Sequence, residues 1–134
     1  MRKIAAALAG LAGAVTLMAF STPGEMARSP AAQAKLEKWL AGRIPADTKA
    51  CVETHVTANP IGIDDHTVLF RDGPRIWRND LRSGTNCGSL DRQSTIVTAS
   101  QANRMCNGDD FGIYQNGTMV GACTLGDFVL YKKQ

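Results

Sequence analysis

The sequence has few charged and aromatic residues and lacks the common catalytic motifs. Charged residues make up 20% of the chain and aromatic residues 6%, and there are two histidines. No Cys-x-x-Cys pair occurs, which argues against a redox-active dithiol, and the cysteine spacing does not resemble a zinc site. A glycine-rich phosphate loop and a nucleophile elbow are also missing. These absences identify no catalytic class, and we expect no cofactor.

The size and charge of the chain limit its organisation and its partners. A chain of 134 residues has room for one domain. The formal net charge is +3, but Arg2 and Lys3 lie in a segment that we expect to be removed. The remaining chain is close to neutral, so we expect it not to bind nucleic acid, since that binding relies on clustered positive charge.

The first residues have the composition of a secretory signal peptide, which we assign to 1–21. Arg2 and Lys3 precede an apolar stretch at 4–20, which is short for a bilayer span of about 20 residues. Small residues near Ser21 favour cleavage after it. No second long apolar stretch follows. We therefore expect a periplasmic or secreted protein with no stable membrane insertion after cleavage.

A helix is expected at the start of the mature domain. Residues 22–29 are expected to form a tether without fixed structure, which leaves residues 30–134 as one domain. Ser29 followed by Pro30 is typical of a helix N-terminus. Apolar residues at three- and four-residue spacing then predict an amphipathic helix of about three turns that ends before Gly42. Its apolar face holds Ala32, Leu36, Trp39 and Leu40. We expect Trp39 to dock the helix on a sheet rather than to stack on a ligand.

From Cys51 onward the pattern changes to short runs of β-forming residues between Gly, Asn, Asp and Pro. So many short runs leave little room for parallel crossovers, so the connections should be hairpins. We therefore expect a mainly β fold, a small antiparallel β-barrel or sandwich with one N-terminal amphipathic helix packed outside. The predicted strands are 51–57, 66–71, 75–80, 94–99, 110–115, 118–123 and 127–132.

Two hairpins can be predicted in detail from their turn residues. In the later one, an Asn-Gly dipeptide places Ile113 opposite Val120. In the earlier one, the Asp-Gly-Pro turn at 72–74 places Phe70 opposite Ile76. Apolar residues then fall on both faces of the earlier hairpin, with Val68, Phe70 and Ile76 on one face and Leu69, Trp77 and Leu81 on the other. We expect it to be covered on both sides.

The four cysteines all lie in the expected mature chain. An even number in an oxidising compartment predicts two disulfides among Cys51, Cys87, Cys106 and Cys123. Their spacing leaves all three pairings open, including a local bond from Cys106 to Cys123. Each bond could add roughly 2 to 4 kcal/mol to the stability of such a small core.

Positive charge is concentrated along the earlier hairpin. Arg71, Arg75, Arg78 and Arg82 flank Trp77, and together they predict an exposed apolar and arginine-bearing patch. Such a patch could receive a carboxylate, a phosphorylated lipid head or an acidic protein surface. The alternative is that these charges solvate an exposed edge and prevent edge-to-edge pairing.

The only group of residues with metal-ligand chemistry is His55, Asp64, Asp65 and His66. An Asp-Asp pair before a strand more often accepts backbone N–H groups in a turn, so we expect no metal site. A small periplasmic hydrolase or metal-dependent enzyme that uses His55 or His66 remains the alternative function from another class.

Several motifs resemble a family of small exported proteobacterial proteins, common in sphingomonads and classed as a domain of unknown function. They lie at 38–43, 50–52, 63–68, 77–81, 105–109 and 125–128. The resemblance covers nearly the whole mature chain, and it implies no activity and no catalytic or binding residues. It does imply the disulfides Cys51 to Cys106 and Cys87 to Cys123, because some relatives keep the first pair without the second.

We therefore expect an exported periplasmic binding domain that is not an enzyme, with a protein or envelope component as its partner. A narrower alternative is an inhibitor of an envelope-degrading enzyme, because a small disulfide-bonded β-domain with a rigid loop suits that task.

Overall fold

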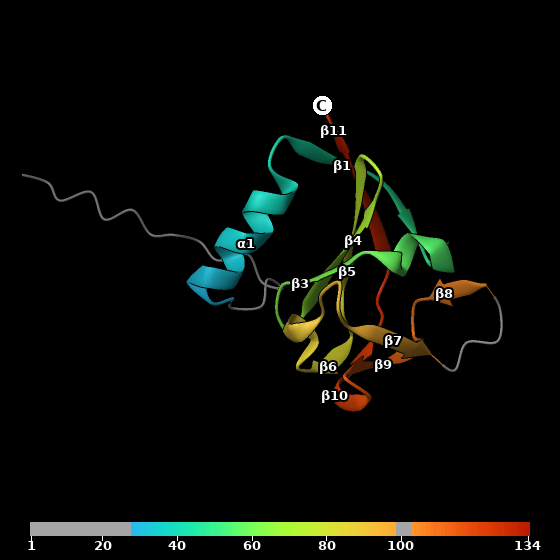
Figure 1. The fold of residues 1–134 in the computed structure, drawn as a ribbon. Helices are drawn as coiled ribbons and strands as arrows, with labels where there is room; N and C mark the ends of the chain where they lie inside the picture. Colours follow the sequence, from blue (N-terminus) through green and yellow to red (C-terminus); the bar gives the residue numbers. More distant parts are fainter. Residues whose placement is uncertain (1–27, 99–102) are drawn as a thin grey trace, which may run out of the picture.

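The computed structural model describes residues 28–98 and 103–134, and the expected signal peptide at 1–21 and most of the tether lie outside this part (Figure 1). The described chain is mainly β with one α-helix, and all its strand pairs are antiparallel, as expected. No helix in these residues is long and apolar enough to cross a membrane.

The described strands form three sheets. The five-stranded sheet has the order β1 (Arg43–Lys49), β11 (Phe128–Lys133), β5 (Arg75–Asp80), β4 (Thr67–Asp72), β3 (Pro60–Gly62). The four-stranded sheet has the order β6 (Ser83–Thr85), β10 (Thr118–Thr124), β9 (Asp110–Gln115), β7 (Thr95–Thr98). The two-stranded sheet pairs β2 (Cys51–Glu53) with β8 (Arg104–Cys106). Two 3-10 helices complete the fold, η1 (Thr54–Ala58) and η2 (Cys87–Ser89).

Helix α1 (Pro30–Leu40) begins and ends as its sequence predicts. The Ser29 hydroxyl accepts a hydrogen bond from the backbone N–H of Ala32 at 3.2 Å, and Pro30 occupies the first turn. Gly42 follows the helix with a φ of 69°, a left-handed conformation that favours glycine. Trp39 packs against the apolar cluster beneath the helix, as expected. The cluster contains Ala32, Leu36, Ile63, Leu69 and Ile76, with Trp39, Leu40, Ile61 and Tyr131 at its edge.

The main core lies between the five-stranded and four-stranded sheets. Phe70 of β4 and Phe128 of β11 face Phe111 and Ile113 of β9 in one buried cluster. The rings of Phe70 and Phe128 lie 6.0 Å apart. The β4–β5 hairpin is therefore covered on both faces, by α1 on one side and by the second sheet on the other (Figure 1). The sheets do not close into a barrel, so of the two architectures we expected the sandwich is the closer description.

Both predicted hairpins exist, and the Asn-Gly turn pairs Gln115 with Thr118 as expected, but each hairpin contains a predicted pair that is one residue out of register. Ile113 lies opposite Gly121 and not Val120, because an irregularity between Met119 and Gly121 inserts a residue into β10. Beyond the irregularity, the residues of the later hairpin therefore lie one position away from their predicted partners.

In the earlier hairpin, Phe70 lies opposite Trp77 and not Ile76, because Asp72 pairs with Arg75 across a two-residue turn. A shift of one residue exchanges the two faces of a strand. Trp77 therefore joins Phe70 in the main core, and Ile76 joins the cluster under α1.

Some short or polar strands were not predicted. Strand β1 is exposed along most of its length and contains Pro45, which sits at a register shift on the sheet edge where its missing N–H is tolerated. Strands β3, β6 and β8 have three residues each, too few for an alternating pattern. The predicted strand 51–57 ends at Glu53, and the chain continues as η1.

The disulfides are Cys51 to Cys106 and Cys87 to Cys123, as the family resemblance implied. Cys51 and Cys106 lie directly opposite each other in β2 and β8. The second bond ties η2 to β10 of the four-stranded sheet. The local bond from Cys106 to Cys123 is therefore not formed.

Candidate functional site

The arginines expected in one patch are distributed over different surroundings, and Trp77 is not exposed. Its side chain is part of the main core, with a relative exposure of 5%. Arg71 lies on the α1 side of the hairpin, since it is the register partner of Ile76, and Arg75 pairs with Asp72 at 2.9 Å. The structure thus corrects the expectation of an exposed patch centred on Trp77.

Arg78 and Arg82 contribute to separate structural contacts. Arg78 Nε donates to Asp80 Oδ1 at 3.0 Å, and although burial alone would lower the pKa of Arg78, its contacts with Asp80 and Tyr131 raise it above the ordinary value. The backbone N–H of Arg82 donates to Thr124 O at 2.9 Å.

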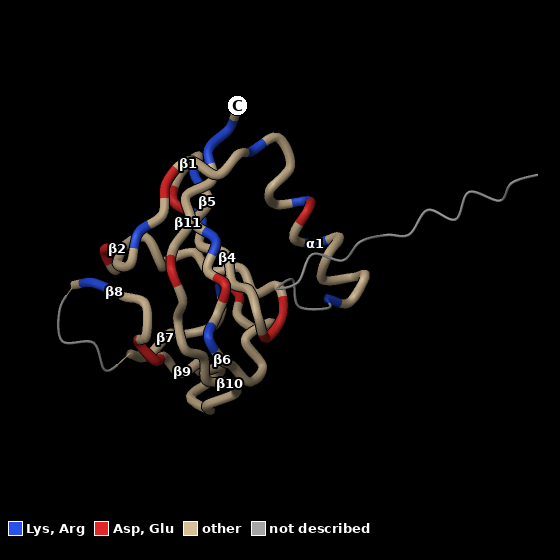
Figure 2. The backbone as a smooth tube through the Cα atoms, turned by 180° about the vertical axis from the view of Figure 1, so that it is seen from behind, with Lys and Arg blue, Asp and Glu red and all other residues tan. Residues whose placement is uncertain are grey.

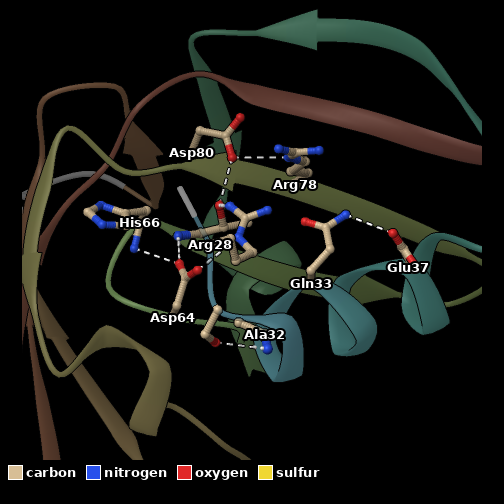
Figure 3. Close-up of polar contacts among 10 residues, drawn as sticks. Arg28, Ala32, Gln33, Glu37, Asp64, His66, Arg78 and Asp80 are labelled. Atoms are coloured by element: carbon tan, nitrogen blue, oxygen red, sulfur yellow. Dashed lines mark hydrogen bonds and ion pairs between the residues drawn. The ribbon is translucent and has the colours of Figure 1, made fainter. Parts of the chain in front are cut away.

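The contact of Arg78 with Asp80 belongs to a chain of polar contacts that reaches the start of α1 (Figure 3). Asp80 Oδ1 accepts a hydrogen bond from the buried Thr67 hydroxyl at 2.9 Å. That hydroxyl accepts a bond from Arg28 Nη2, and Arg28 Nε donates to Asp64 Oδ2 at 2.8 Å. We call these five residues the Arg28 network. It ties the segment before the helix to β4 and β5.

Asp64 is held in its charged form by this network. Burial alone would raise its pKa, but bonds from the N–H groups of His66 and Thr67 and the contact with Arg28 together hold the pKa below its ordinary value. Asp65 accepts a bond from the Cys87 N–H at 2.9 Å. Asp64 therefore acts as a turn acceptor, as the sequence predicted, whereas Asp65 bonds a backbone N–H of the distant η2.

The histidines lie in different surroundings. His55 is exposed and its Nδ1 lies 3.1 Å from Glu53 Oε2, whereas His66 lies at the turn before β4 beside Asp64 (Figure 3). Across residues 28–98 and 103–134, no group of three or more His, Cys, Asp or Glu side chains is arranged to hold a metal ion.

A groove beside α1 combines apolar and cationic side chains, and we call it the Trp39 groove. It has a volume of about 310 Å³, at the lower end of the range for ligand pockets. The half-buried Trp39 and the residues Pro60, Ile61 and Leu90 supply its apolar lining. The full lining consists of Lys35, Trp39, Asn59, Pro60, Ile61, Arg71, Leu90, Asp91 and Arg92.

The charged residues of the Trp39 groove differ in whether they already form hydrogen bonds or ion pairs within the protein. Lys35 Nζ donates to Gly62 O at 2.6 Å. The Asp91 carboxylate accepts bonds from the N–H groups of Gln93 and Ser94 at 2.8 and 3.0 Å. In the part of the chain that the structure describes, the side chains of Arg71 and Arg92 form no ion pair or hydrogen bond with another residue. The groove therefore offers two uncommitted guanidinium groups beside an apolar surface.

A second hollow, which we call the Trp77 cavity, has a volume of about 350 Å³ and a more polar lining. Lys49 Nζ lies 5.9 Å from the centre of the Trp77 ring, and within the described part of the chain the Trp77 Nε1–H has no hydrogen-bond partner. Arg75 in its wall is paired with Asp72, and His55 with Glu53. The lining consists of Lys49, Cys51, Val52, Glu53, His55, Val56, Asp72, Arg75, Trp77 and Arg104.

Charge is unevenly distributed over the fold. The strands β6, β7, β9 and β10 contain a single charged residue, Asp110, whereas Lys and Arg residues mark α1, β1, β8 and the β4–β5 hairpin (Figure 2). On the nearly uncharged sheet, Val97 and Met119 are exposed. Positive charge is therefore available near the Trp39 groove and scarce on the opposite sheet.

Sequence reasoning found only part of the Trp39 groove. It singled out Arg71 as a binding residue and Trp39 as a packing residue. Lys35 could have been found, because it lies one helical turn before Trp39 on the same side of α1. Nothing in the sequence connects Pro60, Leu90 or Arg92 with the helix, since they come from β3 and from the loop after η2.

Comparisons of the chain with models of protein families, with characterised proteins and with solved structures find no match in any of the three.

Proposed function

We propose that this protein is an exported binding domain without catalytic activity, and that its ligand is a small envelope component that occupies the Trp39 groove. The observation that carries this proposal is the groove itself, an apolar hollow of about 310 Å³ with a half-buried tryptophan in its wall. Ligand pockets typically combine a mainly apolar lining with a few polar groups that orient the ligand.

The groove is built on fixed elements, which favours binding without a large ordering cost. The Leu90 N–H donates to Cys87 O at 3.2 Å, and Leu90 O accepts from the Gly62 N–H at 2.8 Å. The disulfide from Cys87 to Cys123 holds η2 in turn. Leu90 is thereby positioned between η2 and β3.

The composition of the groove supports binding over covalent catalysis. Its lining, taken over residues 28–98 and 103–134, contains no Ser, Thr, Cys or His side chain, and these are the usual nucleophiles and bases of hydrolases. The signal-like N-terminus and the two disulfides support a periplasmic or secreted location, where disulfides form and persist. An envelope component is therefore the ligand that such a protein would meet.

Native mass spectrometry of the mature protein, isolated from its own periplasm, tests this proposal. We expect a fraction of the protein to carry an added small-molecule mass, and we expect Trp39→Ala to lose it while His55→Ala retains it. Circular dichroism of both variants establishes that they are folded.

Other outcomes of the same measurement would favour the alternatives. A stoichiometric metal that is lost in His55→Ala would support the metal-dependent enzyme. An associated envelope-degrading enzyme would support the inhibitor. A small-molecule mass that persists in Trp39→Ala would place the ligand elsewhere and contradict the proposal.

A further inference from the structure

Two guanidinium groups that have no ion-pair or hydrogen-bond partner among the described residues border the Trp39 groove. Arg71 comes from β4 and Arg92 from the loop after η2, so distant parts of the chain bring them to the same hollow. Lys35 from α1 adds a third positive charge. Asp91 supplies the carboxylate among the described lining residues, and it is engaged by backbone N–H groups of its own turn. The rim is therefore complementary to an anion.

We infer that the ligand of the Trp39 groove is a small amphipathic carboxylate, with its head group at Arg71 and Arg92 and its apolar body against Trp39. This inference rests on the proposed function and names the class of its ligand. A guanidinium group presents paired N–H donors that match the two oxygens of a carboxylate.

The apolar lining and the volume determine the rest of the ligand. Trp39, Pro60, Ile61 and Leu90 offer no charged partner, so a compact polyanion would leave this surface unused. A volume of about 310 Å³ lies at the lower end of the range for ligand pockets, so a short aliphatic chain with one carboxylate suits this space.

The Trp77 cavity lacks this combination, although it also contains cationic residues. Arg75 is committed to Asp72, and Glu53 and Asp72 add negative charge to the lining. Lys49 already lies over the Trp77 ring. Selectivity for an amphipathic anion is therefore expected at Trp39 and not at Trp77.

Octanoate and 1-octanol are matched probes, because they share the chain length and differ in head-group charge. The chain has two tryptophans, so a ¹H–¹⁵N spectrum of the labelled mature protein contains two indole N–H signals. We expect octanoate to move the Trp39 signal in a saturable manner and to leave the Trp77 signal in place. We expect 1-octanol to bind at least tenfold more weakly.

Substitution of the two arginines identifies the head-group site. Arg71→Gln and Arg92→Gln should each weaken octanoate binding by about tenfold, the loss expected for a hydrogen bond to a charged group. Arg75→Gln is the matched control and should bind as the unaltered protein does, because Arg75 lies in the other hollow. Added NaCl should weaken the binding of octanoate and leave that of 1-octanol unchanged.

The outcomes separate this inference from the proposed function. Equal binding of octanoate and 1-octanol at Trp39 would overturn the carboxylate assignment and leave the groove as a binding site. Tighter binding of octyl phosphate than of octanoate would also overturn the assignment. If neither octyl probe moves the Trp39 signal, the inference fails, and the native mass measurement then decides whether the groove holds another ligand.

Discussion

Replacement of Arg28 by glutamine should loosen the attachment of α1 to the five-stranded sheet. Arg28 lies just before the helix and donates to Asp64 and to the buried Thr67 hydroxyl. Its side chain is only 10% exposed and that of Asp64 21%, so solvent screens their interaction only in part. Arg28→Gln removes the positive charge and keeps a polar side chain of similar reach.

The expected loss of unfolding free energy is about 2 kcal/mol at neutral pH. A hydrogen bond to a charged group contributes roughly 1.5 to 3 kcal/mol, and the residual exposure of both side chains places this pair toward the lower part of that range. Asp64 keeps its two bonds from backbone N–H groups in the variant, which limits the loss.

The effect should also depend on pH in a defined direction. The pKa of Asp64 is lower in the folded protein than its ordinary value of 3.8, so its charged form stabilises the fold above that ordinary value. This stabilisation is lost as the pH falls through the folded-state pKa. The difference between the unaltered protein and Arg28→Gln should therefore be largest at neutral pH and shrink below about pH 4.

Urea denaturation of the mature protein with its disulfides intact, followed by circular dichroism from pH 3 to pH 8, measures both effects. Gln33→Ala is a suitable control, because Gln33 bonds to Glu37 on the exposed face of the same helix, and its loss should cost less than about 0.5 kcal/mol. A cost below about 0.5 kcal/mol for Arg28→Gln, or a cost independent of pH, would refute the structural role that we assign to Arg28.

Three further variants test the interior of the fold. Asn79→Ala should lower the free energy of unfolding, measured by urea denaturation, by about 2 to 5 kcal/mol, because the fully buried Asn79 bonds both the N–H and the C=O of Gly126. A loss below about 1 kcal/mol would contradict this role. Replacing Cys87 and Cys123 together by alanine should lower the free energy of unfolding by about 4 kcal/mol, because the disulfide closes a loop of 36 residues in the unfolded chain. The urea midpoint measures this loss, and an unchanged midpoint would contradict the prediction. Gly62→Ala should lower the melting temperature at a cost of about 1 to 3 kcal/mol, because its Cβ would lie 2.6 Å from Gly88 O, and an unchanged melting temperature would show that η2 can move aside.

Local signals predicted the elements that they control directly. The Ser29 and Pro30 start, the apolar spacing and Gly42 predicted α1, and the alternation within 75–80 and 110–115 predicted β5 and β9 with their observed bounds. Register was harder to predict. An extra residue near Val120 has no clear sequence signal, and a one-residue difference in the 72–75 turn moved Trp77 from an expected surface into the core.

The Trp39 groove could not be predicted as a unit for a related reason. Its residues come from α1, β3, β4 and the loop after η2, and only the packing of the helix on the sheet brings them together. The sequence identified Arg71 through local charge density, but four arginines at similar spacing could not be distinguished without knowing which face each one takes.

A crystal structure of the mature protein with octanoate tests the central claim most directly. We predict electron density for the ligand in the Trp39 groove, with carboxylate oxygens within hydrogen-bond distance of the guanidinium groups of Arg71 and Arg92 and the chain against the Trp39 ring. Ligand density in the Trp77 cavity or on the nearly uncharged sheet, with the Trp39 groove empty, would contradict the account.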